Sequence, residues 1–137
     1  MAISAVIEFG SNDVKRYNNR YLVSDCRFLF ARPYNGFTPS RPTRCERIEV
    51  TVIAPGKEDL TLIKWFSSQD VLSGRIVIGM PNDNSQNSAD TQELYFEAAK
   101  CFSLSEVYDI DVSRRRQFKI ALTAESIETD GVTFNRI

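Results

Sequence analysis

The chain has 137 residues, of which 42% are hydrophobic and 26% charged, and its formal net charge is −1. This composition is typical of a soluble globular protein and predicts one domain over residues 1–137. The near-neutral charge argues against a general nucleic-acid-binding surface. The sequence contains no histidine, which excludes histidine-dependent catalytic triads and every metal site with a histidine ligand.

The N-terminal residues predict no secretory signal. No basic segment precedes the apolar residues of 3–9, and Glu8 interrupts them before a hydrophobic stretch develops. No uncharged apolar stretch reaches the roughly 20 residues of a transmembrane helix. We therefore expect the chain to be made in the cytosol, so that any export would require another machine.

Apolar and polar residues alternate with a period of two along most of the chain, which predicts β-strands. The first strand, 3–9, is followed by a turn at 10–13, a short polar strand at 14–17 and a tight turn at Asn18 and Asn19, because asparagine tolerates positive φ. The inward face of the first strand would be Ile3, Ala5, Ile7 and Phe9.

Two further strands are predicted at 20–31 and 46–53. In the longer strand, the residues that share one face are Leu22, Ser24, Cys26, Phe28 and Phe30. In the strand at 46–53, the inward residues would be Ile48, Val50 and Val52, and the outward ones Arg47, Glu49 and Thr51. This clean alternation indicates a sheet with one buried face.

A short helix is predicted at about 58–67, where the period of two is lost after Pro55 and Gly56. Its spacing of apolar residues gives one broad apolar face, and acidic residues stand at its N-terminal end, as the helix dipole favours. The apolar face comprises Leu60, Leu62, Ile63 and Phe66, and the acidic residues are Glu58 and Asp59. We expect Leu62, Trp65 and Phe66 to plug a barrel end or flank; the alternative is that part of this face meets a partner.

The second half of the chain again predicts strands, at 74–79, 93–99, 101–110 and 117–127. The core face of the last strand would be Phe118, Ile120, Leu122 and Ala124. Thr129, Asp130 and Gly131, followed by apolar residues, predict a closing hairpin. About eight strands and one short flanking helix indicate a mainly β protein, an antiparallel β-barrel or a tightly curled sandwich.

The sequence offers no catalytic or cofactor motif. It lacks a P-loop, a dinucleotide-binding glycine motif, a nucleophile elbow and an EF-hand loop. Three widely spaced cysteines, Cys26, Cys45 and Cys101, cannot supply the four thiolates of an all-cysteine zinc site. We expect them to be free and buried, although one intermolecular disulfide stays open. We therefore predict no enzyme, no cofactor and no metal.

Charge is unevenly distributed around two irregular segments, 32–44 and 80–92. Five arginines between 27 and 47 oppose only Glu46, whereas residues 80–99 carry acids and no base. Either these signs cancel within the monomer, or a basic face of one copy meets an acidic face of the next, an arrangement that generates rings or filaments. The candidate interface residues are Tyr34, Phe37, Arg41, Arg44 and Arg47, and the candidate acidic counter-face is Asp83, Asp90 and Glu93.

Five short motifs follow one another in the second half of the chain: Trp65-Phe66, S-G-R-I-V-I at 73–78, L-Y-F-E-A at 94–98, A-L-T-A-E-S-I at 121–127 and G-V-T-F at 131–134. Their order resembles that of the TssD (Hcp-like) tube proteins of Bacteroidetes type VI secretion systems. The resemblance covers about residues 20–137. The Asn/Asp/Ser-rich segment 80–92 and the triple arginine at 114–116 depart from the family pattern, which suggests a divergent paralogue.

The resemblance implies a non-enzymatic β-barrel subunit that forms stacked hexameric rings. In that family, the tube is expelled by a contractile sheath without a signal peptide and can hold small effectors in its lumen. The implied partners are sister copies, sheath, spike and effector proteins, with no nucleic acid and no membrane insertion. The segment 32–44 would be an arm that reaches a neighbouring subunit. The rival interpretation is a monomeric barrel that binds a small apolar ligand, or an adaptor; it predicts an enclosed apolar cavity.

Overall fold

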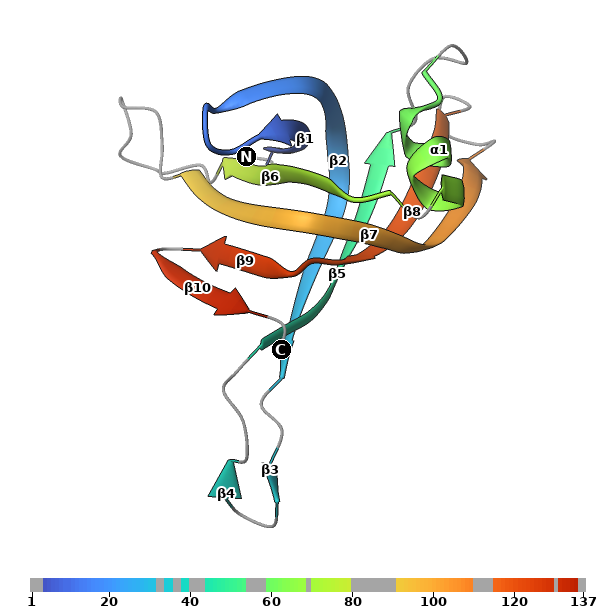
Figure 1. Ribbon diagram of the computed structural model, residues 1–137. Coiled ribbons are helices and arrows are strands. Elements are labelled where there is room, and N and C mark those ends of the chain that lie inside the picture. Colours follow the sequence, from blue (N-terminus) through green and yellow to red (C-terminus); the bar gives the residue numbers. More distant parts are fainter. Residues whose placement is uncertain are drawn as a thin grey trace, which may run out of the picture.

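The computed structural model describes residues 4–31, 34–35, 38–39, 44–53, 59–68, 70–79, 91–109, 115–129 and 131–135. Within these residues lie one helix and ten strands (Figure 1). The elements in chain order are β1 (Ser4–Ser11), β2 (Arg16–Ala31), β3 (Tyr34–Asn35), β4 (Thr38–Pro39), β5 (Arg44–Ile53), α1 (Thr61–Ser68), β6 (Leu72–Gly79), β7 (Thr91–Asp109), β8 (Arg115–Thr123), β9 (Ser126–Thr129) and β10 (Val132–Asn135).

Six strands form a closed antiparallel barrel, which confirms the predicted fold class. Their order is β7-β6-β1-β2-β5-β8, and a further pairing between β7 and β8 closes the ring. β9 pairs with the first half of β7, and β10 pairs with β9. The predicted C-terminal hairpin therefore extends the sheet at β7, outside the ring of six barrel strands. The short strands β3 and β4 pair only with each other among the described residues, and Figure 1 shows them projecting away from the barrel.

The barrel interior is filled by the apolar residues that alternate along the strands. Phe9 is buried, and its ring meets the rings of Tyr21, Trp65 and Phe96 edge-on, with centroids 5.2–6.0 Å apart. Such edge-to-face contacts add to the free energy gained by burying apolar area. The predicted inward residues Ile48, Val50, Val52, Phe118, Ile120, Leu122 and Ala124 are all buried, so the core face was read correctly in β5 and β8.

The predicted short strand at 14–17 and tight turn at Asn18 and Asn19 are wrong. β2 runs without interruption from Arg16, and the turn before it contains Lys15 with φ of 54°. Phe9 pairs with Asn19 and Gly10 with Tyr17, so Asn18 is an extra residue accommodated as a β-bulge. The ladder to β1 overrides the local turn preference of asparagine.

A second bulge in β2 changes which side chains point inward. Val23 pairs with Val52 and Asp25 with Thr51, so Ser24 is an extra residue in β2. An inserted residue exchanges the two faces of a strand. Cys26 and Phe28 pack against the core as predicted, whereas Leu22, which was placed on the same face, is exposed; Phe30 at the end of that face is also exposed.

β7 is one bent strand where two were predicted. It bends near Ala98, whose φ of 52° is unusual for a residue with a side chain. The first half pairs with β6 and β9, and the second half pairs with β8. Conversely, the single strand predicted at 117–127 is two, because β8 ends at Thr123 and Glu125 N–H donates to Glu97 O at 3.0 Å before β9 begins.

Helix α1 is capped and anchored by specific hydrogen bonds. The Thr61 amide donates to Asp59 Oδ1 at 3.0 Å, and the Tyr21 hydroxyl donates to Asp59 Oδ2 at 2.8 Å. Trp65 Nε1 donates to Ala99 O at 3.0 Å beside the bend of β7. Leu62 and Trp65 are buried, as predicted, but Phe66 is 41% exposed and does not plug the barrel.

Candidate functional site

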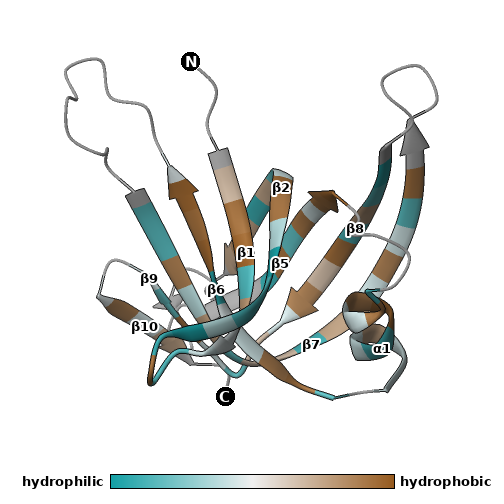
Figure 2. Cartoon of the chain, turned by 90° about the horizontal axis from the view of Figure 1, so that it is seen from above, coloured by the Kyte–Doolittle hydropathy of each residue, from teal (hydrophilic) through white to brown (hydrophobic). Residues whose placement is uncertain are grey.

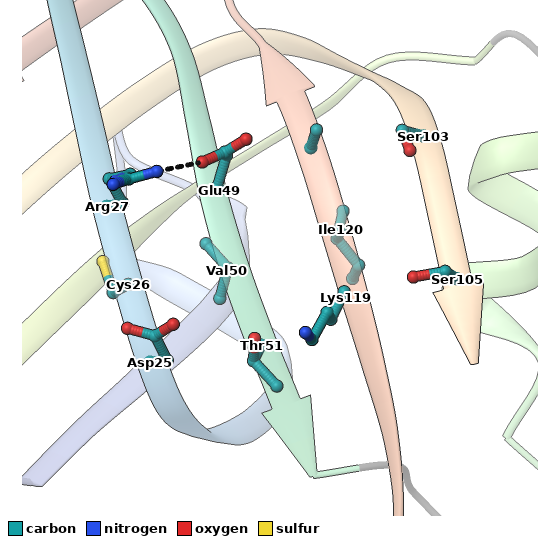
Figure 3. A pocket seen from close by; sticks show the side chains of 11 residues that line it. Asp25, Cys26, Arg27, Glu49, Val50, Thr51, Ser103, Ser105, Lys119 and Ile120 are labelled. Atoms are coloured by element: carbon teal, nitrogen blue, oxygen red, sulfur yellow. Dashed lines mark hydrogen bonds and ion pairs between the residues drawn. The ribbon is translucent and has the colours of Figure 1, made fainter. Parts of the chain in front are cut away.

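The outer side of the barrel carries a shallow polar groove over four adjacent strand segments. We call residues 25–31 of β2, β5, β8 and residues 103–109 of β7 the four-stranded wall. The hollow on this wall measures about 570 Å³ and is open to solvent (Figure 3). Its small side chains are Thr51, Ser103, Ser105 and Ala121, and its charged side chains are Asp25, Arg27, Glu49 and Lys119.

Each of two cross-strand rows on the four-stranded wall carries one positive and one negative side chain. One cross-strand row is Arg27, Glu49, Ala121 and Ser103, and the next is Asp25, Thr51, Lys119 and Ser105. The guanidinium of Arg27 lies 3.4 Å from the Glu49 carboxylate, and Arg47 lies 3.5 Å from its other oxygen. This mixed, hydrated surface suits water or a polar partner; it is not the enclosed apolar cavity that the small-ligand interpretation requires.

A second polar cluster occupies the outer face of β1, β6 and β7. Arg75 Nε donates to Glu8 Oε1 at 2.9 Å, its guanidinium lies over the Tyr17 ring at 4.4 Å, and its NH1 lies 3.6 Å from Glu93. Burial acts to lower the pKa of Arg75, but the hydrogen bond and charge of Glu8 outweigh it and raise the pKa. The Tyr95 hydroxyl donates to Glu93, which raises the pKa of Tyr95.

Asn12 fixes the first turn of the chain to this cluster. Its Nδ2 group lies 3.0 Å from Gly74 O, 3.1 Å from Phe96 O and 2.9 Å from Glu97 Oε1. The Tyr17 hydroxyl donates to Asn12 Oδ1 at 2.7 Å. One side chain therefore joins the turn to β6 and β7, a role that the sequence pattern did not indicate.

Two strand segments on opposite sides of the four-stranded wall have a free hydrogen-bonding edge within the described residues. Residues 25–31 of β2 pair with β5 alone, and residues 103–109 of β7 pair with β8 alone. Unpaired N–H and C=O groups along an edge are a template for pairing with another strand. No local sequence pattern marks these edges, because they result from the bends of β2 and β7.

The structure describes only part of the predicted set of interface residues. Tyr34 lies in β3 and Arg44 at the start of β5, and only their backbones are described. Phe37, Arg41, Asp83 and Asp90 lie outside the described residues. Arg47 and Glu93 lie on strands that are not paired with each other, and each contacts a charged residue of its own chain, so the predicted contact between copies stays a prediction.

Both described cysteines, Cys26 and Cys101, are free thiols; Cys101 is buried, as predicted, whereas Cys26 is only half-buried. Burial raises the pKa of Cys26 to about 12 and that of Cys101 to about 11, so both stay protonated at neutral pH. In the described part of the chain, no three His, Cys, Asp or Glu side chains are placed to hold a metal ion. No helix in that part has the length and apolar character needed to cross a membrane.

The comparisons with known proteins agree with this architecture. The family model "Hemolysin coregulated protein Hcp (TssD)" matches residues 1–137. Hcp1 from Flavobacterium johnsoniae superposes with a TM-score of 0.68 at 19% identity, over 99% of this chain and 100% of that one. Hcp1 from the E. coli EAEC 042 pathovar gives 0.63 at 12% identity, over 98% and 96%.

Further solved structures share the fold at similarly low identity. Hcp1 from Salmonella typhimurium gives a TM-score of 0.62 at 13% identity, over 98% of this chain and 92% of that one. A Yersinia pestis protein described as a type VI secretion system effector gives 0.61 at 8% identity, over 98% and 100%. No curated protein matches by sequence. Since the family model spans the whole chain and the fold agrees, the chain belongs to the TssD (Hcp) family, the β-barrel tube proteins of type VI secretion systems.

Proposed function

We propose that this chain is a tube subunit that forms hexameric rings, which stack into a hollow tube and are expelled by the secretion apparatus. The observation that carries the proposal is the pair of free edges on opposite sides of the four-stranded wall. A subunit with two different adhesive edges assembles head to tail, and such contacts close into a ring when the rotation between copies permits it.

The strand directions of the wall support this assembly. Each neighbouring pair in the order β2-β5-β8-β7 is antiparallel, so β2 and β7 run in opposite directions. Strand β7 of one copy beside β2 of the next therefore continues the antiparallel alternation. Edge-strand addition of this kind satisfies the backbone groups that a monomer leaves to water.

The polar groove supports a role in carrying cargo. A ring in which the walls of the copies join would present Arg27, Glu49, Asp25 and Lys119 on one continuous surface. A hydrated surface of mixed charge suits small folded effectors, and the Yersinia pestis structure described as an effector shares this fold. We place the polar side of the wall toward the lumen for this reason.

The remaining parts of the proposal follow from the family. Residues 1–137 act as one structural domain without catalytic activity or cofactor. The subunit is made in the bacterial cytoplasm and leaves through the apparatus without a signal peptide, in contact with sheath, spike and effector proteins. The segment 32–44 reaches an adjacent copy, where Arg41 and Arg44 meet acidic residues such as Asp83 and Asp90.

The proposal is tested by the mass and shape of the purified protein. We expect light scattering to give about six times the 15.6 kDa monomer mass and negative-stain microscopy to show rings. A monomer at high concentration would refute it. The combined charge reversal Arg41→Glu and Arg44→Glu should loosen the contacts between copies, whereas Arg16→Glu, an exposed residue at the start of β2, is the matched control.

A further inference from the structure

One side of helix α1 is apolar and exposed. Leu60, Ile63 and Phe66 follow each other at intervals of three residues, and 46%, 41% and 41% of their surfaces are exposed. The neighbouring side of the helix buries Leu62 and Trp65. We call Leu60, Ile63 and Phe66 the α1 ridge. Contiguous apolar side chains on the surface of a small protein mark an interaction site.

The α1 ridge lies next to one free edge of the wall. Trp65 Nε1 donates to Ala99 O and fixes the helix on β7 four residues before the edge at 103–109 begins. Phe102, at the bulge between these points, is 50% exposed. Figure 2 shows α1 beside β7, on the side of the barrel where β7 forms the edge of the four-stranded wall.

A second exposed apolar group lies at the end of the other free edge. Phe30, the penultimate residue of β2, is 43% exposed, and its ring contacts the Phe134 ring of β10 with centroids 5.1 Å apart. Val132, at the start of β10, is 53% exposed. We call Phe30, Val132 and Phe134 the hairpin patch.

The direction of the strands relates the two groups. In an antiparallel pair, the beginning of one strand lies beside the end of the other. Suppose that residues 103–109 of one copy pair with residues 25–31 of the next. The start of the β7 segment, which is nearest to α1, then lies beside the end of the β2 segment, which contains Phe30. We infer that the contact between neighbouring copies buries the α1 ridge of one copy against the hairpin patch of the next, beside this strand pairing.

This inference rests on the proposed function and names the surfaces that form its ring contact. A second copy is the occupant because the two apolar groups lie at the matching ends of two complementary edges of one chain. An unrelated partner on the α1 ridge would leave the hairpin patch uncovered. Because the contact is apolar, it should persist in 1 M salt, where exposed charge pairs are screened beyond about 3 Å.

The test compares three aspartate variants of the full chain by light scattering and circular dichroism. We expect Ile63→Asp on the α1 ridge and Val132→Asp on the hairpin patch to keep the native spectrum and to weaken assembly at least ~100-fold, since each buries a charge in an apolar contact. Val14→Asp is the control, because Val14 is an exposed apolar residue that belongs to neither the α1 ridge nor the hairpin patch. The control should assemble like the wild type.

Cross-linking then tests whether the two groups meet. Ile63→Cys and Val132→Cys chains, mixed and oxidised gently, should give disulfide-linked dimers, whereas each variant alone should give only the wild-type background. Two results would overturn this inference and leave the proposed function standing. The first is that the Ile63→Asp variant forms rings as readily as the wild type, and the second is that the mixed cysteine variants give no more disulfide-linked dimer than the background. A monomeric wild type would instead overturn the proposed function itself.

Discussion

The close approach of β1 and β6 at Gly74 yields a sharp prediction for a single substitution. A Cβ atom at this position would lie 2.0 Å from Glu8 O and 3.0 Å from the Phe9 Cα, and these neighbours are backbone atoms. Ordinary contacts of a Cβ atom begin at 3.4 Å. Gly74→Ala therefore requires the two strands to separate by more than an ångström, since no flexible side chain can move aside.

The expected cost follows from that displacement. Neighbouring strands lie about 4.8 Å apart, and a separation of about 1 Å lengthens an N–H···O bond beyond its useful range. Overpacking costs about 1–3 kcal/mol, and each hydrogen bond lost from the ladder adds about 0.5–1.5 kcal/mol. We expect a loss of about 3–5 kcal/mol, a large part of the ~5–15 kcal/mol that stabilises a domain. Asn12, which donates to Gly74 O, would be displaced as well.

Urea unfolding followed by far-ultraviolet circular dichroism measures this loss. Gly131→Ala is the matched control, because Gly131 has φ of 79° and no atom within 4 Å of an added Cβ. Only backbone strain applies there, so we expect about 1 kcal/mol. If Gly74→Ala unfolds within 1 kcal/mol of the wild type, the reasoning from the strand contact is refuted.

Three further predictions concern the attachment of α1. Trp65→Phe should cost about 3 kcal/mol in urea unfolding, because the buried Ala99 carbonyl loses its donor; a change below 0.5 kcal/mol would contradict this. Asp59→Ala should cost about 1–2 kcal/mol and Asp59→Asn less, because asparagine keeps an acceptor for the Thr61 amide; equal losses would argue against the cap. Burial, and then the hydrogen bond to Asp59, raise the pKa of Tyr21 to about 12, so roughly 2 kcal/mol of stability is present below pH 10 and is lost as the pH rises to 12. Tyr21→Phe should flatten the fall in stability over that range, and an unchanged slope would show that Tyr21 does not cause it.

The residues of β5 and β8 show how far local pattern determines this protein. Ile48, Val50 and Val52 alternate with polar residues in a strand whose inward face is uninterrupted, so period two predicted their burial correctly. Gly131 has the positive φ that its turn requires, and the sequence predicted that hairpin. The order of the motifs in the second half, which begins with Trp65-Phe66 on helix α1 and continues on strands, was sufficient to indicate the family by resemblance.

The same rule failed wherever a strand gains a residue or bends. The extra residue Ser24 exchanges the faces of β2, so that Cys26 points inward and Leu22 outward, and the left-handed φ of Ala98 turns one strand toward two different partners. Neither feature has a signal within a few residues of sequence, since both are held by pairing with strands far along the chain.

The amino-acid sequence alone determined the β class, the buried faces of the regular strands and the short helix. Only the tertiary structure decided which segments pair, and therefore that residues 25–31 and 103–109 keep an open edge among the described residues and that Phe66 faces solvent. Alternation is a local property set by side-chain burial on one face of a strand. Barrel closure and free edges depend on hydrogen bonds between residues distant in sequence, whose partners no local pattern specifies.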